Sequence, residues 1–531
     1  MTEREQVAGG AAADASGTRG EADELRGAMV DQLVADAARW RRLHLAEELQ
    51  GPVVTALRAV PRHLFTPGVP LATAYKNTPV VIKTDERSAS LSPVSAPGAI
   101  ALMLTQLDVR PGESVLEIGS GGYQAALLRE LVGPDGSVTT LDIDPDVVSR
   151  ARACLDRAGY GDVRTVCADG EDGAPGYGPF DKIIVAVQAW DIPPAWIAQL
   201  APHGRLVLPL LTRWLTRSWA LDRQDGHLVS RSRYPCAFVP MQGAGKHRTW
   251  SVPVDEAGAS LASDEPIDVD GAALAGVLAA ERSEAWSGVT GRVGEPMSGL
   301  DLWLITVPGQ CLLTVSQDAV DRGLADPSMK EGTPALADGG SLAYLAKVRP
   351  VDGERTVFEV GAYGHGPRGA ELAEQLADHL RVWDREHRHG SGPVLTVHPA
   401  STTASDLPPG HVISKHHTTM VLSWPEDSPI PTSGSLLRRF PVGRVTGRGA
   451  RPSSPSGRGR AGGSARPGRR SRVHRAPRSS LPSSPARGGT ARARRGLPRG
   501  SRRLRVPRGR PPRQRRSTGP RSPPGTPCPW R

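Results

Sequence analysis

The chain has 531 residues, and at about 150 residues per domain this length predicts roughly three structural units. It is 38% hydrophobic and 23% charged, as globular proteins are, and no segment approaches the roughly 18 consecutive apolar residues needed to cross a bilayer. The first 25 residues lack the apolar core of a secretion signal, and the five cysteines are widely spaced with no C-x-x-C pair. The composition therefore argues against a membrane protein, a disulfide scaffold and a thiolate zinc site, and favours a cytoplasmic protein.

The net charge of +11 is unevenly distributed along the chain. Residues 428–531 hold 28 Arg and no Lys, Asp or Glu, whereas residues 1–427 hold 38 basic and 55 acidic residues, a net charge of −17. An acidic globular body therefore precedes a disordered tail of Arg, Pro, Gly and Ser that cannot bury a core. The tail is either an arm that binds nucleic acid non-specifically or a segment without a selected role, because a GC-rich gene read out of frame has this composition.

The N-terminal part of the chain predicts a short disordered segment followed by helices. Residues 1–24 are rich in Ala, Gly and Glu and are predicted to be disordered. From Leu25 on, apolar residues recur at helical spacing in two runs, the second of which ends at Pro61. We expect residues 25–98 to form a helical cap and a substrate loop.

Residues 99–250 alternate between helical and strand patterns. Short buried strands are predicted at 114–118, 137–143, 163–167, 183–187 and 205–210, with helices at 100–107, 124–131, 146–158 and 194–200. This alternation predicts an α/β fold with a doubly wound, mostly parallel sheet that is covered by helices on both faces. Beyond it, residues 251–427 are predicted to form an α+β accessory domain, with short strands such as 302–307 and one clear helix at 370–383.

The strongest local signal is the sequence Val115-Leu116-Glu117-Ile118-Gly119-Ser120-Gly121-Gly122, in which a strand runs into glycines and then into a helix. Glycines allow a ligand to approach the backbone, and a helix N-terminus offers unpaired N–H groups. The next strand ends at Asp142, 23 residues after Gly119, where a carboxylate can accept both hydroxyls of a ribose. The combination favours a nucleoside site over a plain tight turn.

The loop favours S-adenosylmethionine over a nicotinamide dinucleotide as the nucleoside ligand. It lacks the third glycine of the G-x-G-x-x-G fingerprint. Glu117 stands before the loop, where its charge would repel a pyrophosphate but suits a ligand with a sulfonium and an ammonium group. Asp169, followed by Gly170, ends the third strand. Asp169 could accept a hydrogen bond from the adenine amino group, or it could simply form a turn after a strand.

Five motifs occur in the order typical of one known family, namely Val60-Pro61-Arg62-His63-Leu64-Phe65, Val94-Ser95-Ala96-Pro97, Val115-Leu116-Glu117-Ile118-Gly119, Asp169-Gly170 and Gly204-Arg205-Leu206-Val207. Together they resemble the protein-L-isoaspartate O-methyltransferases, which are S-adenosylmethionine-dependent carboxyl methyltransferases, over about residues 28–245. The resemblance implies a class I, Rossmann-like methyltransferase fold and S-adenosylmethionine as cofactor. It also implies a role for each matching residue: Ser95 as the active-site serine, Glu117, Gly119, Ser120 and Gly121 lining the cofactor, Asp142 holding the ribose, and Asp169 with Gly170 facing the adenine.

A narrower resemblance extends over more of the chain. The glycine loop is one residue shorter than the family's usual G-x-G-x-G-Y, and further matches lie at 189–194, 238–245, 286–289 and 423–425. These features look like the FxLD-system methyltransferases, which are found beside lanthipeptide-type precursor peptides. The resemblance implies that the substrate is an Asp of a modified peptide and that residues 251–427 recognise this peptide. The family pattern ends near Pro425.

The chemistry implied by the resemblance requires little acid–base catalysis. A carboxylate with a pKa near 4 is already ionised, and hence nucleophilic, at neutral pH. We expect Ser95 to hydrogen-bond the substrate carboxylate or its peptide; the alternative is a Ser that caps the helix beginning near Pro97. The methyl ester formed can close to a succinimide and open to Asp or isoAsp, which is repair when it starts from isoAsp and installation of a new linkage when it starts from Asp.

Other interpretations of the chain remain open at this point. His411, His416 and His417 could suggest a metal, but they lack Cys or carboxylate partners in the sequence, and we expect no metal. The expected partner is a peptide or protein that bears Asp or isoAsp, with no membrane partner. The rival hypotheses are a general isoaspartate repair enzyme, a non-catalytic nucleic-acid binder that uses the basic tail, and a degenerate methyltransferase fold that only binds peptide.

Overall fold

The structure is a computed structural model of the chain. The chain divides into two units, Met1–Phe440 and Pro441–Arg531, and every described residue belongs to the first. The basic tail predicted at 428–531 and the predicted cofactor residue Ser120 therefore lie outside the described residues. Those residues are 3–42, 47–84, 90–119, 121–292, 295, 297, 299–329 and 332–425.

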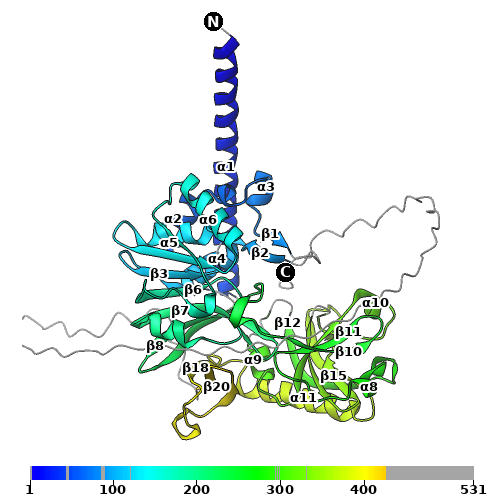
Figure 1. Ribbon diagram of the computed structural model, residues 1–531. Helices are drawn as coiled ribbons and strands as arrows, with labels where there is room; N and C mark the ends of the chain where they lie inside the picture. Colours follow the sequence, from blue (N-terminus) through cyan, green and yellow to red (C-terminus); the bar gives the residue numbers. More distant parts are fainter. Residues whose placement is uncertain are drawn as a thin grey trace, which may run out of the picture. The chain divides into compact units, whose positions relative to one another are not determined.

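The N-terminal region is helical, as predicted, but its first helix starts earlier. Helix α1 spans Glu3–Arg42, so the structure differs from the predicted disorder of residues 1–24 (Figure 1). The physical reason is composition, since Ala and Glu are strong helix formers. Helix α2 spans Gly51–Ala59 and contacts α1. Most apolar residues on the predicted helical faces are buried in the same core, namely Met29, Val30, Leu33, Ala37, Val53, Leu57 and Val60, whereas Trp40 is half-buried and Val34 is exposed.

A short hairpin that the sequence did not predict follows these helices. It consists of β1 (Val80–Thr84) and β2 (Ser90–Val94), which pair antiparallel. Between α2 and this hairpin lie the 3-10 helix η1 (Arg62–Phe65) and helix α3 (Leu71–Ala74).

The main sheet contains a parallel half in the order β7-β6-β3-β4-β5. The first strand of this half, β3, lies in the middle, and the strand order reverses between β3 and β6. This is the order of a doubly wound nucleotide-binding sheet. The bounds are Ser114–Ile118 for β3, Ser137–Asp142 for β4, Arg164–Cys167 for β5, Phe180–Val185 for β6 and Leu200–Thr212 for β7.

The predicted parallel arrangement holds for the strands β7-β6-β3-β4-β5, but the other half of the main sheet is antiparallel, so the sheet as a whole is mixed rather than mostly parallel. Within the described residues ten strands join in this sheet, and four of their nine pairings are parallel. The physical reason is loop length, because the two-residue turns after β7 and β8 can connect only antiparallel neighbours. The additional strands are β8 (Leu215–Gln224), β9 (His227–Pro235), β18 (Val394–Pro399), β19 (His411–Ser414) and β20 (Thr418–Ser423).

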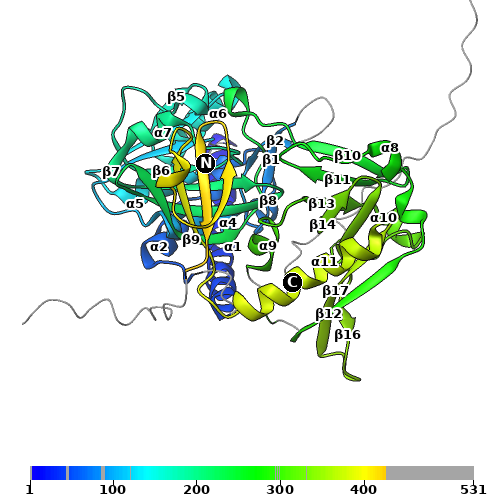
Figure 2. The same cartoon turned by 90° about the horizontal axis from the view of Figure 1, so that it is seen from below.

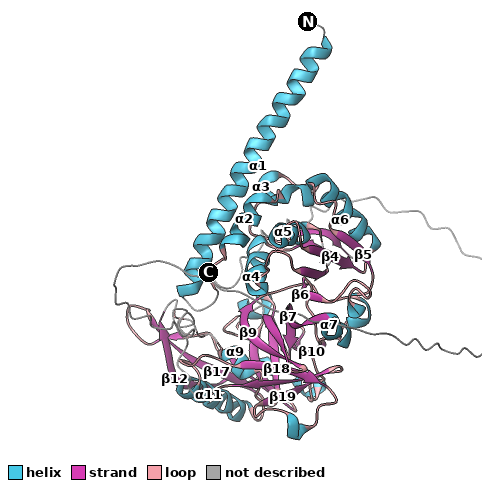
Figure 3. Ribbon diagram, turned by 90° about the vertical axis from the view of Figure 1, so that its left-hand side faces the viewer, coloured by secondary structure: helices cyan, strands magenta, loops and turns pink. Residues whose placement is uncertain are grey.

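Helices cover both faces of the parallel half (Figure 3). Helices α4 (Pro97–Leu107), α5 (Tyr123–Val132) and α6 (Pro145–Ala158) contribute to one apolar core, and α7 (Pro194–Gln199) contributes Trp196 to the core on the other face. The α6 boundaries have clear causes. Asp144 caps its N-terminus by accepting a hydrogen bond from the Asp146 N–H, and Gly159 ends it in a left-handed conformation.

A second sheet, entirely antiparallel, is built from the region after residue 249. Within the described residues its order is β10-β11-β13-β14-β15-β17-β12, with β16 beside β17, and α11 (Gly369–Glu386) contacts β12, β15 and β17 (Figure 2). The face of α11 predicted from its spacing is buried. The strand bounds are Trp250–Asp255 (β10), Ala259–Ser263 (β11), Ser283–Arg292 (β12), Gln310–Val315 (β13), Thr333–Asp338 (β14), Ser341–Leu345 (β15), Arg349–Pro350 (β16) and Val357–His365 (β17).

One predicted strand of this region is wrong. Residues 302–307 were expected to be extended, but helix α9 spans Leu300–Leu304. Several of its apolar side chains are buried, and a short buried apolar run has no periodicity that separates a helix from a strand. The remaining short helices are α8 (Gly271–Leu274), α10 (Gln317–Asp321), η2 (Gly170–Asp172), η3 (Gly243–Gly245), η4 (Val277–Ala279) and η5 (Ala404–Asp406).

Among the described residues, no helix combines the length and the apolar character that crossing a bilayer requires.

Buried side chains in the parallel half of the main sheet should contribute more to stability than exposed side chains on its antiparallel edge. We predict that replacing the fully buried Ile184 of β6 with Ala lowers the free energy of unfolding by about 2–5 kcal/mol, because it leaves a cavity in a close-packed core. The matched control is Val412→Ala on the edge strand β19, where the side chain is 48% exposed and the expected change is within about 0.5 kcal/mol. Urea unfolding of both variants measures this, and equal changes would contradict the assigned core.

Candidate active site

A cavity of about 470 Å³ opens at the carboxyl ends of the central parallel strands. Gly119 and Gly121 reach it from the turn after β3, and Asp142 lies at the end of β4. Ala186 and Val187 follow β6. Because the strand order reverses between β3 and β6, the cavity lies at the topological switch point, where open parallel sheets bind their ligands.

The turn after β3 requires glycine at its first position. Gly119 has φ +83°, and its N–H donates to the Leu141 carbonyl at 2.8 Å. A Cβ added there would lie 2.8 Å from Cγ1 of Val187, which also lines the cavity. A side chain at residue 119 would therefore displace the cavity wall, which is why the turn needs glycine there. We call the turn at Gly119 and Gly121 the glycine cradle.

The two acidic residues predicted around this turn occupy different environments. Glu117 is fully buried within β3, where its Oε2 accepts a hydrogen bond from the Thr140 hydroxyl at 2.5 Å, and it does not line the cavity. Asp142 does line the cavity, and its Oδ1 accepts a hydrogen bond from the Asp144 N–H at 2.9 Å. The structure thus places Asp142 in the cavity lining at the end of β4 and Glu117 within β3, before the turn.

Asp169 and Gly170 have separate positions at the far end of the cavity. Gly170 lines it, and a Cβ there would lie 2.9 Å from both Ile118 and Met241. Asp169 is not in the lining; its carboxylate accepts hydrogen bonds from the Glu171 N–H at 3.0 Å and the Ala244 N–H at 2.8 Å. Asp169 therefore forms the turn that was its alternative interpretation, and it also holds the segment that follows the lining residues Pro240–Gln242.

Ser95 lies between β2 and α4, next to the cavity. It is half-buried and is not in the lining, although Ser92 and Pro93 of β2 are. The N-cap of α4 is Ala96, and the first-turn Gly98 N–H donates to Oδ1 of Asn77 at 2.8 Å, so the alternative role of Ser95 as a helix cap finds no support. Its assignment as the active-site serine stays a prediction.

Arg62, whose role the motif alone does not indicate, links the residue before Ser95 to the residue after the glycine turn. Its fully buried guanidinium donates to the carbonyls of Ala74 at 2.8 Å and Val94 at 3.4 Å, and it lies 4.9 Å from the centre of the Tyr123 ring. Burial lowers the pKa of Arg62. Arg62 thus ties the residue before Ser95 to the first residue of α5, and the sequence signal was a cation between the apolar residues of the 60–65 motif.

Lys83 is a second residue that the sequence did not reveal. Its Nζ lies at the rim of the cavity, 2.5 Å from Oδ2 of Asp144 and 3.0 Å from Oδ2 of Asp146. The hydrogen bond from Lys83 lowers the pKa of Asp144, and the two carboxylates raise the pKa of Lys83. The pair joins β1 to the start of α6 across one side of the cavity, through a contact 61 residues apart in the chain.

The three histidines considered as metal ligands do not converge. His411 contacts Trp303 and Trp424, whereas His417 lies 2.9 Å from Glu171 and His416 packs against His417. In the part of the chain that the structure describes, no group of three or more His, Cys, Asp or Glu side chains could hold a metal ion.

Comparison with known proteins gives a consistent set of similarities. The family described as "Protein-L-isoaspartate(D-aspartate) O-methyltransferase (PCMT)" matches residues 44–246. A protein-L-isoaspartate O-methyltransferase of Methanopyrus kandleri is 38% identical over 194 residues, which cover 36% of this chain and 83% of that protein. The enzyme of the same name from Hyperthermus butylicus is 39% identical over 201 residues, covering 36% of this chain and 81% of that protein.

Among solved structures, similarity extends to a putative protein-L-isoaspartate O-methyltransferase from Plasmodium falciparum in complex with S-adenosyl-L-homocysteine. It is 19% identical with a TM-score of 0.34, and the match covers 40% of this chain and 97% of that chain.

The glycine cradle provides a direct test of the cavity. We predict that Gly119→Ala weakens binding of S-adenosylhomocysteine at least tenfold, because the added methyl group would push into Val187. The control is Gly112→Ala, which has the same backbone strain at φ +86° but nothing within 4 Å of the added carbon. Calorimetric titration of both variants measures the dissociation constants. Equal affinities for the two variants would show that the cradle does not contact the ligand.

Proposed function

Because the chain belongs to the protein-L-isoaspartate O-methyltransferase family and is an S-adenosylmethionine-dependent methyltransferase of this type, we propose that it esterifies the side-chain carboxylate of an Asp or isoAsp residue in a peptide or protein. The observation that carries this proposal is the cavity at the switch point, where the Gly119 cradle and the Asp142 carboxylate face the same space.

The residues present fit the cofactor. The cradle at Gly119 and Gly121 admits a close backbone approach, and Asp142 offers a carboxylate to a ribose at the end of β4. Gly170 lines the end of the cavity assigned to the adenine, with Asp169 supporting this end through the Ala244 segment. We further propose that Glu117 acts from beneath the turn as a buried negative charge. When bound, S-adenosylmethionine supplies an electrophilic methyl group on a sulfonium.

The protein's contribution to the reaction is positioning and dehydration of the acceptor. A carboxylate with a pKa near 4 is ionised at neutral pH, so no general base has to remove a proton. We propose that the Ser95 hydroxyl donates a hydrogen bond that orients this carboxylate or its peptide. Holding the acceptor in line and removing its water can supply several kcal/mol or more of the lowering of the barrier.

The ester product explains how Asp and isoAsp interconvert. The backbone amide nitrogen that follows the esterified residue attacks the ester carbonyl, loses its proton and expels methanol, which closes a succinimide ring. Water then opens either carbonyl of the ring and yields an aspartyl or an isoaspartyl linkage. The direction of net change depends on the substrate supplied.

We propose that the substrate is a modified peptide of the lanthipeptide type, as the narrower resemblance to the FxLD-system enzymes implies. What supports this over general repair is the amount of structure outside the family match. The match ends at residue 246, and the described chain continues to residue 425 with a second, antiparallel sheet and helix α11. We propose that residues 251–427 recognise this peptide. We also propose a cytoplasmic location, which the free Cys154, Cys167, Cys236 and Cys311 support.

The proposed reaction predicts a chemically distinctive product. Incubating the full chain with methyl-labelled S-adenosylmethionine and Asp or isoAsp peptides should give label that base releases as methanol. We predict that Ser95→Ala lowers kcat/KM by about 10- to 100-fold, the value of one hydrogen bond to a charged group. The control Ser137→Ala, at the exposed first residue of β4 and outside the cavity lining, should leave the rate unchanged. Base-stable label on nitrogen would contradict carboxyl methylation.

The same assay separates installation from repair. We expect the Asp form of a precursor peptide to be methylated faster than an isoAsp form of an unrelated peptide. A preference for isoAsp in any sequence context would instead indicate a general repair enzyme.

A further inference from the structure

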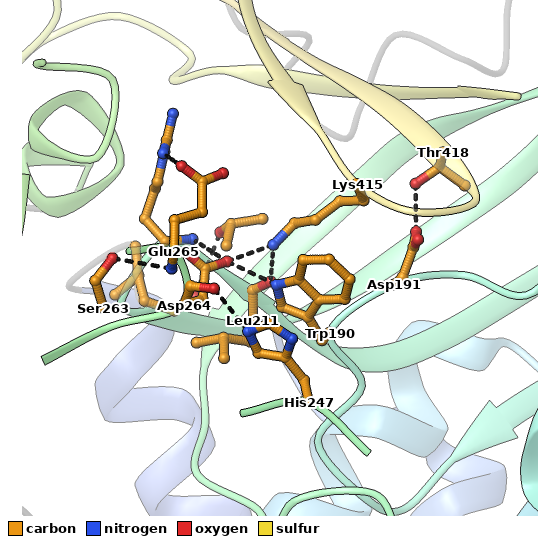
Figure 4. Close-up of polar contacts among 12 residues, drawn as sticks. Trp190, Asp191, Leu211, His247, Ser263, Asp264, Glu265, Lys415 and Thr418 are labelled. Atoms are coloured by element: carbon orange, nitrogen blue, oxygen red, sulfur yellow. Dashed lines mark hydrogen bonds and ion pairs between the residues drawn. The ribbon is translucent and has the colours of Figure 1, made fainter. Parts of the chain in front are cut away.

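The turn of the β19–β20 hairpin, residues Lys415–Thr418, lies far in sequence from the residues 44–246 that match the family. It nevertheless contacts the edge of the main sheet where the cavity opens. The Lys415 side chain is fully buried. Its Nζ pairs with Asp264, donates to the Leu211 carbonyl at 3.3 Å and lies 4.5 Å from the centre of the Trp190 ring (Figure 4). A buried ammonium group is stable only with such partners, so the position of this turn is narrowly defined.

Asp264, directly after β11, is the centre of this contact. Besides Lys415, its Oδ2 accepts hydrogen bonds from the Trp190 indole N–H at 2.9 Å and from the Arg213 N–H at 3.0 Å. Its carbonyl lies 2.6 Å from Nε2 of His247, whose ring stacks on Trp190 with centroids 4.0 Å apart. One carboxylate therefore joins the second sheet, the hairpin turn and the segments after β6 and β7.

A second set of contacts joins the same turn, through His417 and Thr418, to Asp191 and Glu171. The His417 N–H donates to Oδ2 of Asp191 at 2.6 Å, and the Thr418 hydroxyl donates to Oδ1 of Asp191 at 2.5 Å. The His417 ring lies 2.9 Å from Oε1 of Glu171. Asp191 follows Trp190 in the segment after β6, and Glu171 follows Gly170 in the segment after β5.

Two segments contacted by the hairpin turn contribute residues to the cavity lining. The segment after β6 supplies Ala186 and Val187 to the lining, and the segment after β5 supplies Gly170. The Gln188 N–H donates to the Val239 carbonyl at 2.8 Å, which joins the first of these to the lining residues at 239–242. A tie that only joined two domains would have no reason to end on two segments of the cavity wall.

We infer that the β19–β20 hairpin turn positions the wall of the cofactor site. Within it, Lys415, paired with Asp264, is a positioning residue for cofactor binding. The buried pair sets the place of Trp190 and hence of the cavity wall after β6, while His417 sets the place of Gly170 through Glu171. This inference concerns the site of the proposed function, but it depends only on the cofactor and not on the identity of the peptide.

Substituting Lys415 separates positioning from mere support of the fold. We expect Lys415→Met in the full chain to weaken binding of S-adenosylhomocysteine at least tenfold and to lower the melting temperature, because Asp264 is left buried without its cation. The double variant Lys415→Met/Asp264→Asn removes both charges, so its melting temperature should return towards that of the parent. Its affinity for S-adenosylhomocysteine should remain at least tenfold weaker, because the tether to the Leu211 carbonyl is still missing.

Two further variants complete the test. Arg388→Met removes another little-exposed cation, which pairs with Glu295 and Asp384 beyond the cavity lining; it should lower stability and leave affinity unchanged. His417→Ala should weaken affinity with little loss of stability. Recovery of both stability and affinity in the double variant would overturn the inference, and so would parent-like affinity in Lys415→Met. Absence of peptide methylation in a parent chain that binds S-adenosylhomocysteine would count against the proposed substrate and not against this inference.

Discussion

The parallel pairing of β3 with β4 and β6 is the constraint on which the rest of the site depends. Ile118 pairs with Leu141 on one side and with Val185 on the other. The hydrogen bonds continue one residue past the strands, from the Gly119 N–H to Leu141 and from the Ala186 N–H to Ile118, both at 2.8 Å. This pairing alone therefore places three parts of the site at one edge of the sheet: the glycine turn, the Asp142 carboxylate and the cavity wall after β6.

Features that rest on short-range patterns could be predicted from the sequence. Strand β3, the glycine turn and Asp142 follow from an apolar run, positive-φ glycine and a spacing of about 20 residues, all local signals. Features that rest on contacts between distant residues could not. Lys83 meets Asp144 across 61 residues, and no periodicity in either segment indicates the other. Ser95 was found through resemblance alone, and its surroundings show only that it does not act as a helix cap.

The structure departs most from the sequence predictions where the main sheet continues beyond its parallel half. The strands β18, β19 and β20 come from the region expected to form a separate accessory domain, yet they extend the main sheet beyond β9. Alternation of apolar residues predicts a strand, but it carries no information about which sheet the strand will join. The same limit explains α9, whose buried apolar run favours a helix only through its tertiary surroundings.

Through this continuation of the sheet, the C-terminal region contacts the segments that line the cavity. The second sheet contacts the edge of the main sheet at the cavity through Asp264. The last hairpin of the described chain contacts this edge through Lys415 and His417.

A crystal structure of the full chain with S-adenosylhomocysteine is the most direct measurement. The ligand should lie in the cavity above β3 and β4, with its ribose hydroxyls on the Asp142 carboxylate and its adenine beside Gly170. Density for the ligand elsewhere, or a cavity that stays empty at saturating ligand, would contradict the assignment of this site.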